Sequence, residues 1–206
     1  KRGIAGLGED LWKRHLETIR GFWQAVEEYF ISIEVRGFKV YQDGMAADGE
    51  MGGKIIEEGV KSGSKNFEIV SSLLKRGAVL VRTEDYNLLK QELDRLLKIS
   101  KAGTVIRKLA AYLEYRLTKN GLLRRRDEFI ARRVNETLKD GETGIIFVGA
   151  YHDVNCWLAS DIRVAEVKDR RMVADYQKKF PFRERKRKEV EGLSDYLVSS
   201  IEINPA

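Results

Sequence analysis

The sequence is poor in the residues on which disulfide-rich and metal-binding modules depend. Its 206 residues include one Cys, two His, two Pro and three Met. A single Cys excludes a disulfide framework and a Cys-based zinc module. No apolar run approaches the roughly 18 residues of a membrane span, and no signal-peptide pattern opens the chain. The prolines, Pro181 and Pro205, leave every segment before residue 181 free to form helix.

The sequence does contain much charge and enough apolar material for a core. Hydrophobic residues make up 43% of the chain, charged residues 34%, and the net charge is +6. The apolar content is too high for disorder, and a chain of this length buries roughly 70% of its unfolded surface. We therefore expect a globular, cytoplasmic protein without membrane contact. A homo-oligomer is compatible with this composition.

Short apolar segments that alternate with helical periodicities predict an α/β fold. We expect strands at 38–41, 78–81, 144–149 and 162–167. The apolarity of 144–149 is continuous, which is typical of a central parallel strand covered on both faces. Strands separated by helices imply parallel pairing and right-handed crossovers. The predicted architecture is a mostly parallel central sheet of about four strands with flanking helices and a helical insertion.

The pattern between residues 83 and 139 is helical throughout. Its only evident breaks are Gly103 and Gly121, so we expect a hairpin of two helices followed by a third helix at 122–139. Thr83 is expected to cap the first of these helices, because a side-chain oxygen can accept a hydrogen bond from the first turn.

The helices before residue 121 exceed what one crossover between strands needs. We therefore predict one α/β domain, residues 1–206, in which residues 83–121 form a helical insertion that acts as a lid or subdomain. After Pro181, residues 182–206 are expected to form a C-terminal helical tail.

Polar residues follow three of the predicted strands at their carboxyl ends. Gln42 and Asp43 follow the first strand, Arg82 and Glu84 follow the second, and Tyr151, His152 and Asp153 follow the third. Ligands of open α/β sheets bind beyond the carboxyl ends of the strands. Carboxylates, an arginine and a histidine at one edge could support general base catalysis or metal binding. The alternative is that these residues simply end strands at the surface.

Asp127 lies at the start of an otherwise apolar helical stripe. At 100° per residue it falls in line with Ile130 and Val134. Burial of an unpaired carboxylate is expensive. Either this part of the helix reaches the ligand-binding edge, or Asp127 pairs with one of the adjacent arginines, 124–126.

Two segments together resemble a known superfamily. Residues 126–135 read RDEFIARRVN, and residues 145–152 read IIFVGAYH. In this, the chain resembles the TraB/GumN/Tiki and ChaN-like superfamily, whose members pair a helix reading roughly R-[DN]-x-x-[MI]-A with a strand ending in G-x-x-H. The resemblance implies an α/β fold with a cleft that holds Gly-x-x-His histidines and acidic residues. Some members are metal-dependent proteases or esterases, others bind haem or iron, and many have no known activity.

The sequence departs from that superfamily near its beginning. Members usually carry a further Gly-x-x-His or Gly-Glu-x-His motif there, whereas Gly8 and Glu9 are followed by Asp10 and the next histidine is His15. His15 falls on the apolar stripe of a helix predicted at 9–31, so we expect it to pack in a core. One His and one Asp make a poor zinc site, which normally needs three protein ligands.

Because some members are hydrolases, the resemblance is compatible with a hydrolase that acts on a small molecule or a peptide. The candidate catalytic residues are His152 as base or ligand, Asp43 as acidic partner, and Arg126 as anion or transition-state contact. Gln42, the neighbour of Asp43, and Asp127 complete the candidate site. The sequence assigns no cofactor, and a divalent metal is compatible with these side chains.

Two other functions are kept as alternatives. The first is a non-catalytic binding or assembly protein with a decayed site, suggested by the missing histidine motif. The second is a nucleic-acid-binding protein that uses the basic segments 124–133 and 183–188. Nucleic acid is the less favoured partner, because acidic residues interleave with the basic ones and no aromatic binding motif accompanies them.

Overall fold

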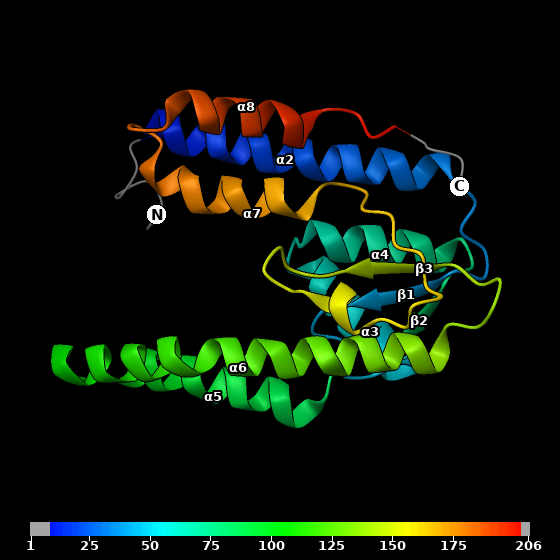
Figure 1. Ribbon diagram of the computed structural model, residues 1–206, viewed down its shortest axis with the longest axis horizontal. Helices are drawn as coiled ribbons and strands as arrows, with labels where there is room; N and C mark the ends of the chain where they lie inside the picture. Colours follow the sequence, from blue (N-terminus) through cyan, green and yellow to red (C-terminus); the bar gives the residue numbers. More distant parts are fainter. Residues whose placement is uncertain (1–8, 203–206) are drawn as a thin grey trace. The chain divides into compact units, whose positions relative to one another are not determined.

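The computed structural model describes residues 9–202, which form two compact units (Figure 1). The helical unit consists of the described residues 9–35 and 165–202, and the sheet unit consists of residues 36–164. None of the helices in the described residues is both long enough and apolar enough to cross a membrane.

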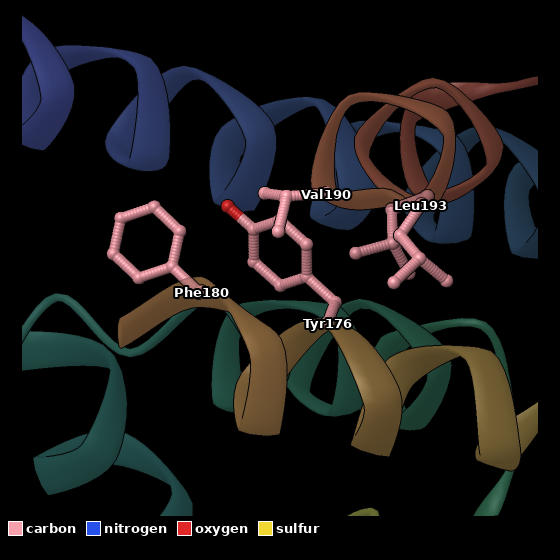
Figure 2. Packing of buried hydrophobic residues seen from close by; sticks show 5 residues of the cluster. Tyr176, Phe180, Val190 and Leu193 are labelled. Carbon is pink, nitrogen blue, oxygen red and sulfur yellow. The ribbon is translucent and has the colours of Figure 1, made fainter. Parts of the chain in front are cut away.

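The helical unit is held together by an aromatic and aliphatic core (Figure 2). Its elements are α2 (Glu9–Ser32), α7 (Arg170–Lys179), the 3₁₀ turn η2 (Phe180–Phe182) and α8 (Arg187–Val198). Tyr176 and Phe180 meet Val190, Leu193 and Leu197 of α8, and part of α2 packs against this cluster. The helix expected at 9–31 is therefore confirmed.

The sheet unit is mostly helical around a small parallel sheet, which is compatible with the predicted α/β class. Its elements are β1 (Lys39–Gln42), α3 (Gly49–Lys61), α4 (Lys65–Lys75), β2 (Val79–Val81), α5 (Tyr86–Lys101), α6 (Val105–Thr137), β3 (Gly144–Phe147) and the 3₁₀ turn η1 (Val154–Trp157). The three strands are parallel and lie in the order β2-β1-β3.

The register of the strands explains how α6 packs on the sheet. Tyr41 is paired with Val81 on one side and with Ile146 on the other, so these side chains form a row on one face. Val134 of α6 packs on Tyr41 and Val81, and all three are buried. The carboxyl-terminal half of α6 thus covers this face of the sheet.

The fourth strand predicted at 162–167 is absent, and this segment is irregular. Ile162 packs against the cluster around Tyr41, but Val164 is 52% exposed. The alternation of apolar and polar residues in this segment therefore does not reflect a buried face, and one anchored side chain does not require strand pairing.

The prediction that β3 is a central strand was wrong. The central strand is β1, which pairs with both neighbours and is almost wholly buried, whereas β3 and β2 lie at the edges. Val79 of β2 is accordingly 52% exposed. A continuous apolar run indicates burial, but it does not show on how many sides a strand is paired.

The break predicted at Gly121 does not occur, because α6 continues through it as one helix from Val105 to Thr137. Propagating a helix adds one hydrogen bond per residue, which offsets the cost of about 1 kcal/mol for a helical glycine.

The prediction that Thr83 caps α5 was also wrong, because the capping residue is Asp85, two residues later. Asp85 accepts hydrogen bonds from the backbone N–H groups of Asn87 and Leu88 at 2.8 and 3.1 Å, while the Thr83 hydroxyl donates to the carbonyl of Gln42.

The segment 83–121, predicted as an insertion, contains α5 and the first half of α6, which form a hairpin within the sheet unit. The segment 182–206, predicted as a tail, contributes α8 to the helical unit.

Two glycines of α3 provide a matched test of the packing between α3 and α4. A methyl group at Gly59 would lie 2.4–2.8 Å from the ring of Phe67, whereas one at Gly53 would meet nothing within 4 Å. Gly59→Ala should therefore lower the free energy of unfolding by about 1–3 kcal/mol through overpacking. Gly53→Ala should raise it by up to about 1 kcal/mol through helix propensity. Urea unfolding of both variants checks this, and equal effects would contradict the packing described.

Candidate functional site

The long helix α6 carries two adjacent polar residues to the carboxyl edge of the sheet. Its last residue, Thr137, lies near the start of β1, because its backbone carbonyl accepts from Lys39 and its hydroxyl is 2.8 Å from that of Tyr41. Arg126 lies eleven residues earlier, about 16 Å back along the axis. This exceeds the roughly 13 Å length of a four-residue strand. Arg126 and Asp127 therefore lie at the opposite, carboxyl edge.

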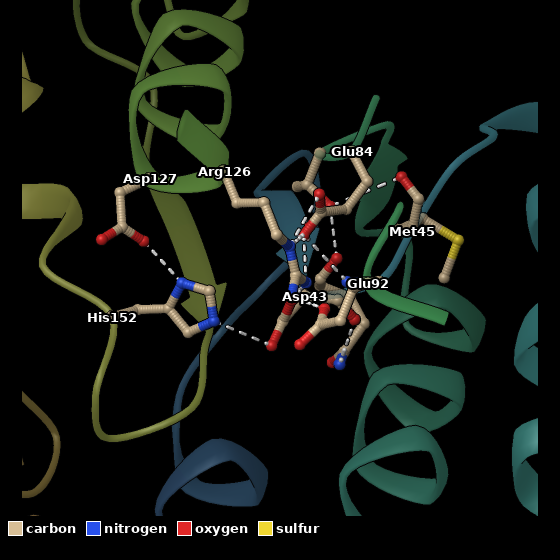
Figure 3. A network of polar contacts seen from close by, with 10 residues as sticks. Asp43, Met45, Glu84, Glu92, Arg126, Asp127 and His152 are labelled. Carbon is tan, nitrogen blue, oxygen red and sulfur yellow. Dashed lines mark hydrogen bonds and ion pairs between the residues drawn. The ribbon is translucent and has the colours of Figure 1, made fainter. Parts of the chain in front are cut away.

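Arg126 is buried among three carboxyl groups (Figure 3). Its Nε donates to both oxygens of Glu84 at 3.1 and 3.3 Å, and its Nη2 donates to Oε1 of Glu84 at 2.6 Å. Nη2 also donates to Oδ1 of Asp43 at 2.5 Å, and Nη1 donates to Glu92. One guanidinium thus connects the ends of β1 and β2 to α5 and α6.

His152 lies between two further carboxylate contacts (Figure 3). Its Nδ1 is 2.5 Å from Oδ1 of Asp127, and its Nε2 is 3.3 Å from Oδ2 of Asp43. The second oxygen of Asp127 accepts from the backbone N–H of Asp153 at 3.0 Å. His152 and Asp127 are buried, whereas the Asp43 side chain is 27% exposed.

The loops after β1 and β2 are fixed to each other by backbone contacts. The N–H groups of Thr83 and Glu84 both donate to the carbonyl of Met45, at 2.9 and 3.0 Å. Gln42 is buried; its amide nitrogen donates to the carbonyl of Asp43 at 3.1 Å, and its Oε1 has no hydrogen-bond partner among the described residues. Backbone contacts thus hold Glu84 and Asp43 at this edge in addition to the contacts of their side chains with Arg126.

The contacts of His152 change the protonation of both partners. Burial alone would lower the pKa of His152, but hydrogen bonds and charges from Asp127 and Asp43 raise it to about 9. Burial works against ionisation of Asp43, yet His152 and Arg126 lower its pKa to about 2. At neutral pH the pair is therefore an imidazolium and a carboxylate.

Glu84 shows the opposite behaviour because it is fully buried. Burial raises its pKa to about 7, although the Arg126 guanidinium opposes this shift. The three carboxylates in turn raise the pKa of Arg126 against the effect of its own burial. Asp43 and Glu84 share one guanidinium nitrogen, and the more exposed Asp43 is the more readily ionised of the two.

The carboxyl groups of the site surround a protein cation. Within residues 9–202, no group of three or more His, Cys, Asp or Glu side chains has an arrangement that could hold a metal ion. Asp43, Glu84 and Glu92 instead converge on Arg126.

The sequence-predicted residues His152, Asp43, Arg126 and Asp127 lie in one connected network, and Gln42 touches its edge through the backbone of Asp43. The sequence predicts that Glu84 lies at this edge but does not assign it a function, and it does not predict the contact of Glu92 with Arg126. Glu92 lies four residues after the buried Leu88, and this spacing is the signal that could have found it.

The other histidine, His15, lies in the helical unit. Its Nδ1 is 3.0 Å from the hydroxyl of Tyr176, and its ring stacks on Phe180 with 4.2 Å between centroids. Burial and the charge of Arg183 lower its pKa. Gly8, with which the comparison to the N-terminal Gly-x-x-His motif begins, lies outside the described residues.

The basic helix segment 124–133 forms ion pairs along its own surface. Arg124 is 3.0 Å from Glu128, and Arg133 is 2.9 Å from Glu136. These contacts are typical of a solvated helix face.

No family model matches this chain, and no curated protein or solved structure shows a significant match to it. The resemblance to the TraB/GumN/Tiki and ChaN-like superfamily depends on the two motifs alone and stays a prediction.

Because the chain has only two histidines, proton NMR can follow each imidazole separately. We expect the His152 resonances to titrate near pH 9 and those of His15 below 6.5, with His15→Gln providing the assignment. The raised pKa of His152 stabilises the folded state fully below pH 6.5, and this stabilisation is lost as the pH rises through 9. Titration of His152 at or below 6.5 would contradict the two carboxylate contacts.

Arg126→Met should lower the free energy of unfolding by about 3–5 kcal/mol, because it removes the cation that Asp43, Glu84 and Glu92 share, while Asp43 keeps its contact with His152. Arg124→Met, two residues earlier on the same helix, removes an exposed arginine paired with Glu128 and should cost less than about 1 kcal/mol. Urea unfolding at pH 7 measures both. Similar losses in the two variants would show that the buried network does not stabilise the sheet unit.

Proposed function

We propose that the sheet unit is a hydrolase of the TraB/GumN/Tiki and ChaN-like type that acts on a small molecule or a peptide. The observation that carries the proposal is the line Asp127–His152–Asp43, in which a histidine is oriented at Nδ1 and faces a partly exposed carboxylate at Nε2. A histidine oriented by one carboxyl group and close to a second polar group is a common proton-transfer arrangement.

In the proposed reaction, water attacks the scissile carbon beside Asp43. Asp43 takes up the proton of the water as the new C–O bond forms, and the His152 imidazolium donates its Nε2 proton to the leaving group as the old bond breaks. The proton on Asp43 then returns to Nε2 across their 3.3 Å contact. A histidine with a pKa of about 9 is charged at neutral pH, so it begins as the acid.

The remaining residues hold this pair in place. Asp127 fixes the orientation of the imidazole, and its second oxygen holds the backbone of Asp153. Arg126 donates every nitrogen to a carboxylate, so in this proposal it positions Asp43 and does not contact the substrate. The side-chain amide of Gln42 donates to the backbone carbonyl of Asp43 and so helps to hold this residue in place.

The test is a panel of chromogenic carboxylic esters, amides and glycosides with the purified chain. Activity on at least one class should fall by about 100-fold or more in His152→Ala, the range expected for loss of a general acid. The rate should also decrease as the pH rises through about 9, because the imidazolium loses its proton. In Asp127→Asn this decrease should begin at lower pH.

His15→Ala is the matched control, since it removes the other histidine from a different unit and should leave the rate unchanged. Activity that survives in His152→Ala, or that increases through pH 9, would contradict the proposed role of His152.

A second candidate function is a non-catalytic binding or assembly protein. It is supported by the saturation of the site, since both ring nitrogens of His152 and all three nitrogens of the Arg126 guanidinium face carboxylates. The low pKa of Asp43 also makes this carboxylate a weak base. Absence of activity across the panel, with the folded state intact, would favour this candidate.

A further inference from the structure

The two ends of the α5–α6 hairpin differ in how they bury their apolar side chains. At the base, Leu88, Leu122 and Phe129 form a buried cluster. We define the hairpin tip as residues 93–114, where α5 ends and α6 begins. Large apolar side chains of the tip are exposed by 37–82%: Leu93, Leu96, Leu97, Ile106, Leu109 and Tyr112. Figure 1 shows both helices extending beyond the sheet.

The exposed side chains are grouped by helical geometry. Leu93, Leu96 and Leu97 are spaced by three and four residues and share one face of α5, and Ile106 and Leu109 share one face of α6. At 100° per residue, Leu93, Leu96 and Leu97 centre on a different face of α5 from Lys98, Lys101 and Ala102, whereas Ile106 and Leu109 lie beside Arg107 and Ala110 on α6. Scattered exposed apolar residues are normal on a protein surface, but neighbouring ones on one helix face are typical of an interaction site.

The hairpin also carries most of the net charge of the chain. The segment 86–120 contains eight Lys and Arg residues and three Asp and Glu residues, so it contributes +5 of the net +6. Its partner should therefore be negatively charged.

Between the two helices the tip is hollowed. A cavity of about 410 Å³ is lined by Lys98, Lys101, Ala102, Arg107, Ala110 and Glu114. The small side chains of Ala102 and Ala110 leave room for a larger apolar group, and three cationic side chains surround them. Lys98 is partly neutralised by an ion pair with Glu114.

We propose that the hairpin tip binds an acidic amphipathic helix of a partner protein. Its apolar face would fill the Ala102–Ala110 hollow and cover Ile106 and Leu109, and its flanking carboxylates would pair with Lys101 and Arg107. Binding of an amphipathic helix in an apolar groove is a recurring mode of recognition.

Other occupants match the tip less well. The tip itself contains five Lys and Arg residues and two Asp and Glu residues, so a second copy of the chain would bring another +3 against it, which disfavours self-association. Nucleic acid would pair with Lys101 and Arg107 but would leave the neighbouring Ile106 and Leu109 without an apolar contact. A membrane surface would contact the protruding side chains of the tip, but it would not fill the hollow lined by Ala102 and Ala110.

The test uses the full chain and a fluorescein-labelled helical peptide of about 18 residues with leucines at i, i+3, i+4 and i+7 and flanking glutamates. Fluorescence anisotropy should show saturable binding that weakens with salt. A peptide with lysines in place of the glutamates, and a scrambled peptide of the same composition, should both bind at least about tenfold more weakly, a difference of about 1.4 kcal/mol.

Two variants localise the binding. Ile106→Ser combined with Leu109→Ser, and Lys101→Glu combined with Arg107→Glu, should each weaken binding of the acidic peptide by at least about tenfold. Ile31→Ser is the control, because Ile31 is 64% exposed in the helical unit and should have no effect.

Four results would overturn the proposal. They are no binding of the acidic peptide, equal binding of the acidic and lysine peptides, unchanged binding by both tip variants, and a tip-dependent interaction with a different occupant. The last is checked by sedimentation of the chain alone, by phosphatidylserine–phosphatidylcholine vesicles and by duplex DNA and RNA.

Discussion

The sheet unit depends on the burial of one guanidinium. Arg126 is 7% exposed, and a charge at such a site is tolerated only when carboxylates satisfy it. Its partners Asp43, Glu84 and Glu92 come from the end of β1, the end of β2 and the first half of α5. The requirement to neutralise one side chain of α6 therefore fixes three other segments of the sheet unit.

The neighbouring residue extends the same constraint to the third strand. Asp127 binds His152 and the backbone of Asp153, so it fixes the loop that follows β3. Two consecutive helical residues can do this because they lie four and three positions before the fully buried Ile130, and hence on either side of the buried stripe. Asp43 connects the contacts of Arg126 with those of His152, since one of its oxygens contacts Arg126 and the other contacts His152.

Much of the site could be predicted from sequence, because apolar periodicity and the ends of strands are local signals. Periodicity predicts the helix that contains Asp127 and Ile130, and the strand ends predict that Asp43 and His152 lie at one edge of the sheet. The order of the strands could not be obtained in this way, since pairing of β1 with both neighbours is decided by long-range contacts. Nor could sequence show that Asp127 would pair with His152 and not with an adjacent arginine. That choice depends on which groups the fold brings within 3 Å.

The hairpin connects the charge network to the outer surface of the sheet unit. Glu92, which binds Arg126, is adjacent in sequence to Leu93, the first exposed leucine of the tip. The two helices also share the buried base formed by Leu88, Leu122 and Phe129. A ligand shifts a conformational equilibrium only by its differential affinity for the two states. A partner at the tip would therefore affect the network only if it bound one placement of α5 against α6 more tightly than another. Within the network, the Glu92–Arg126 contact is the one that joins the two helices of the hairpin directly.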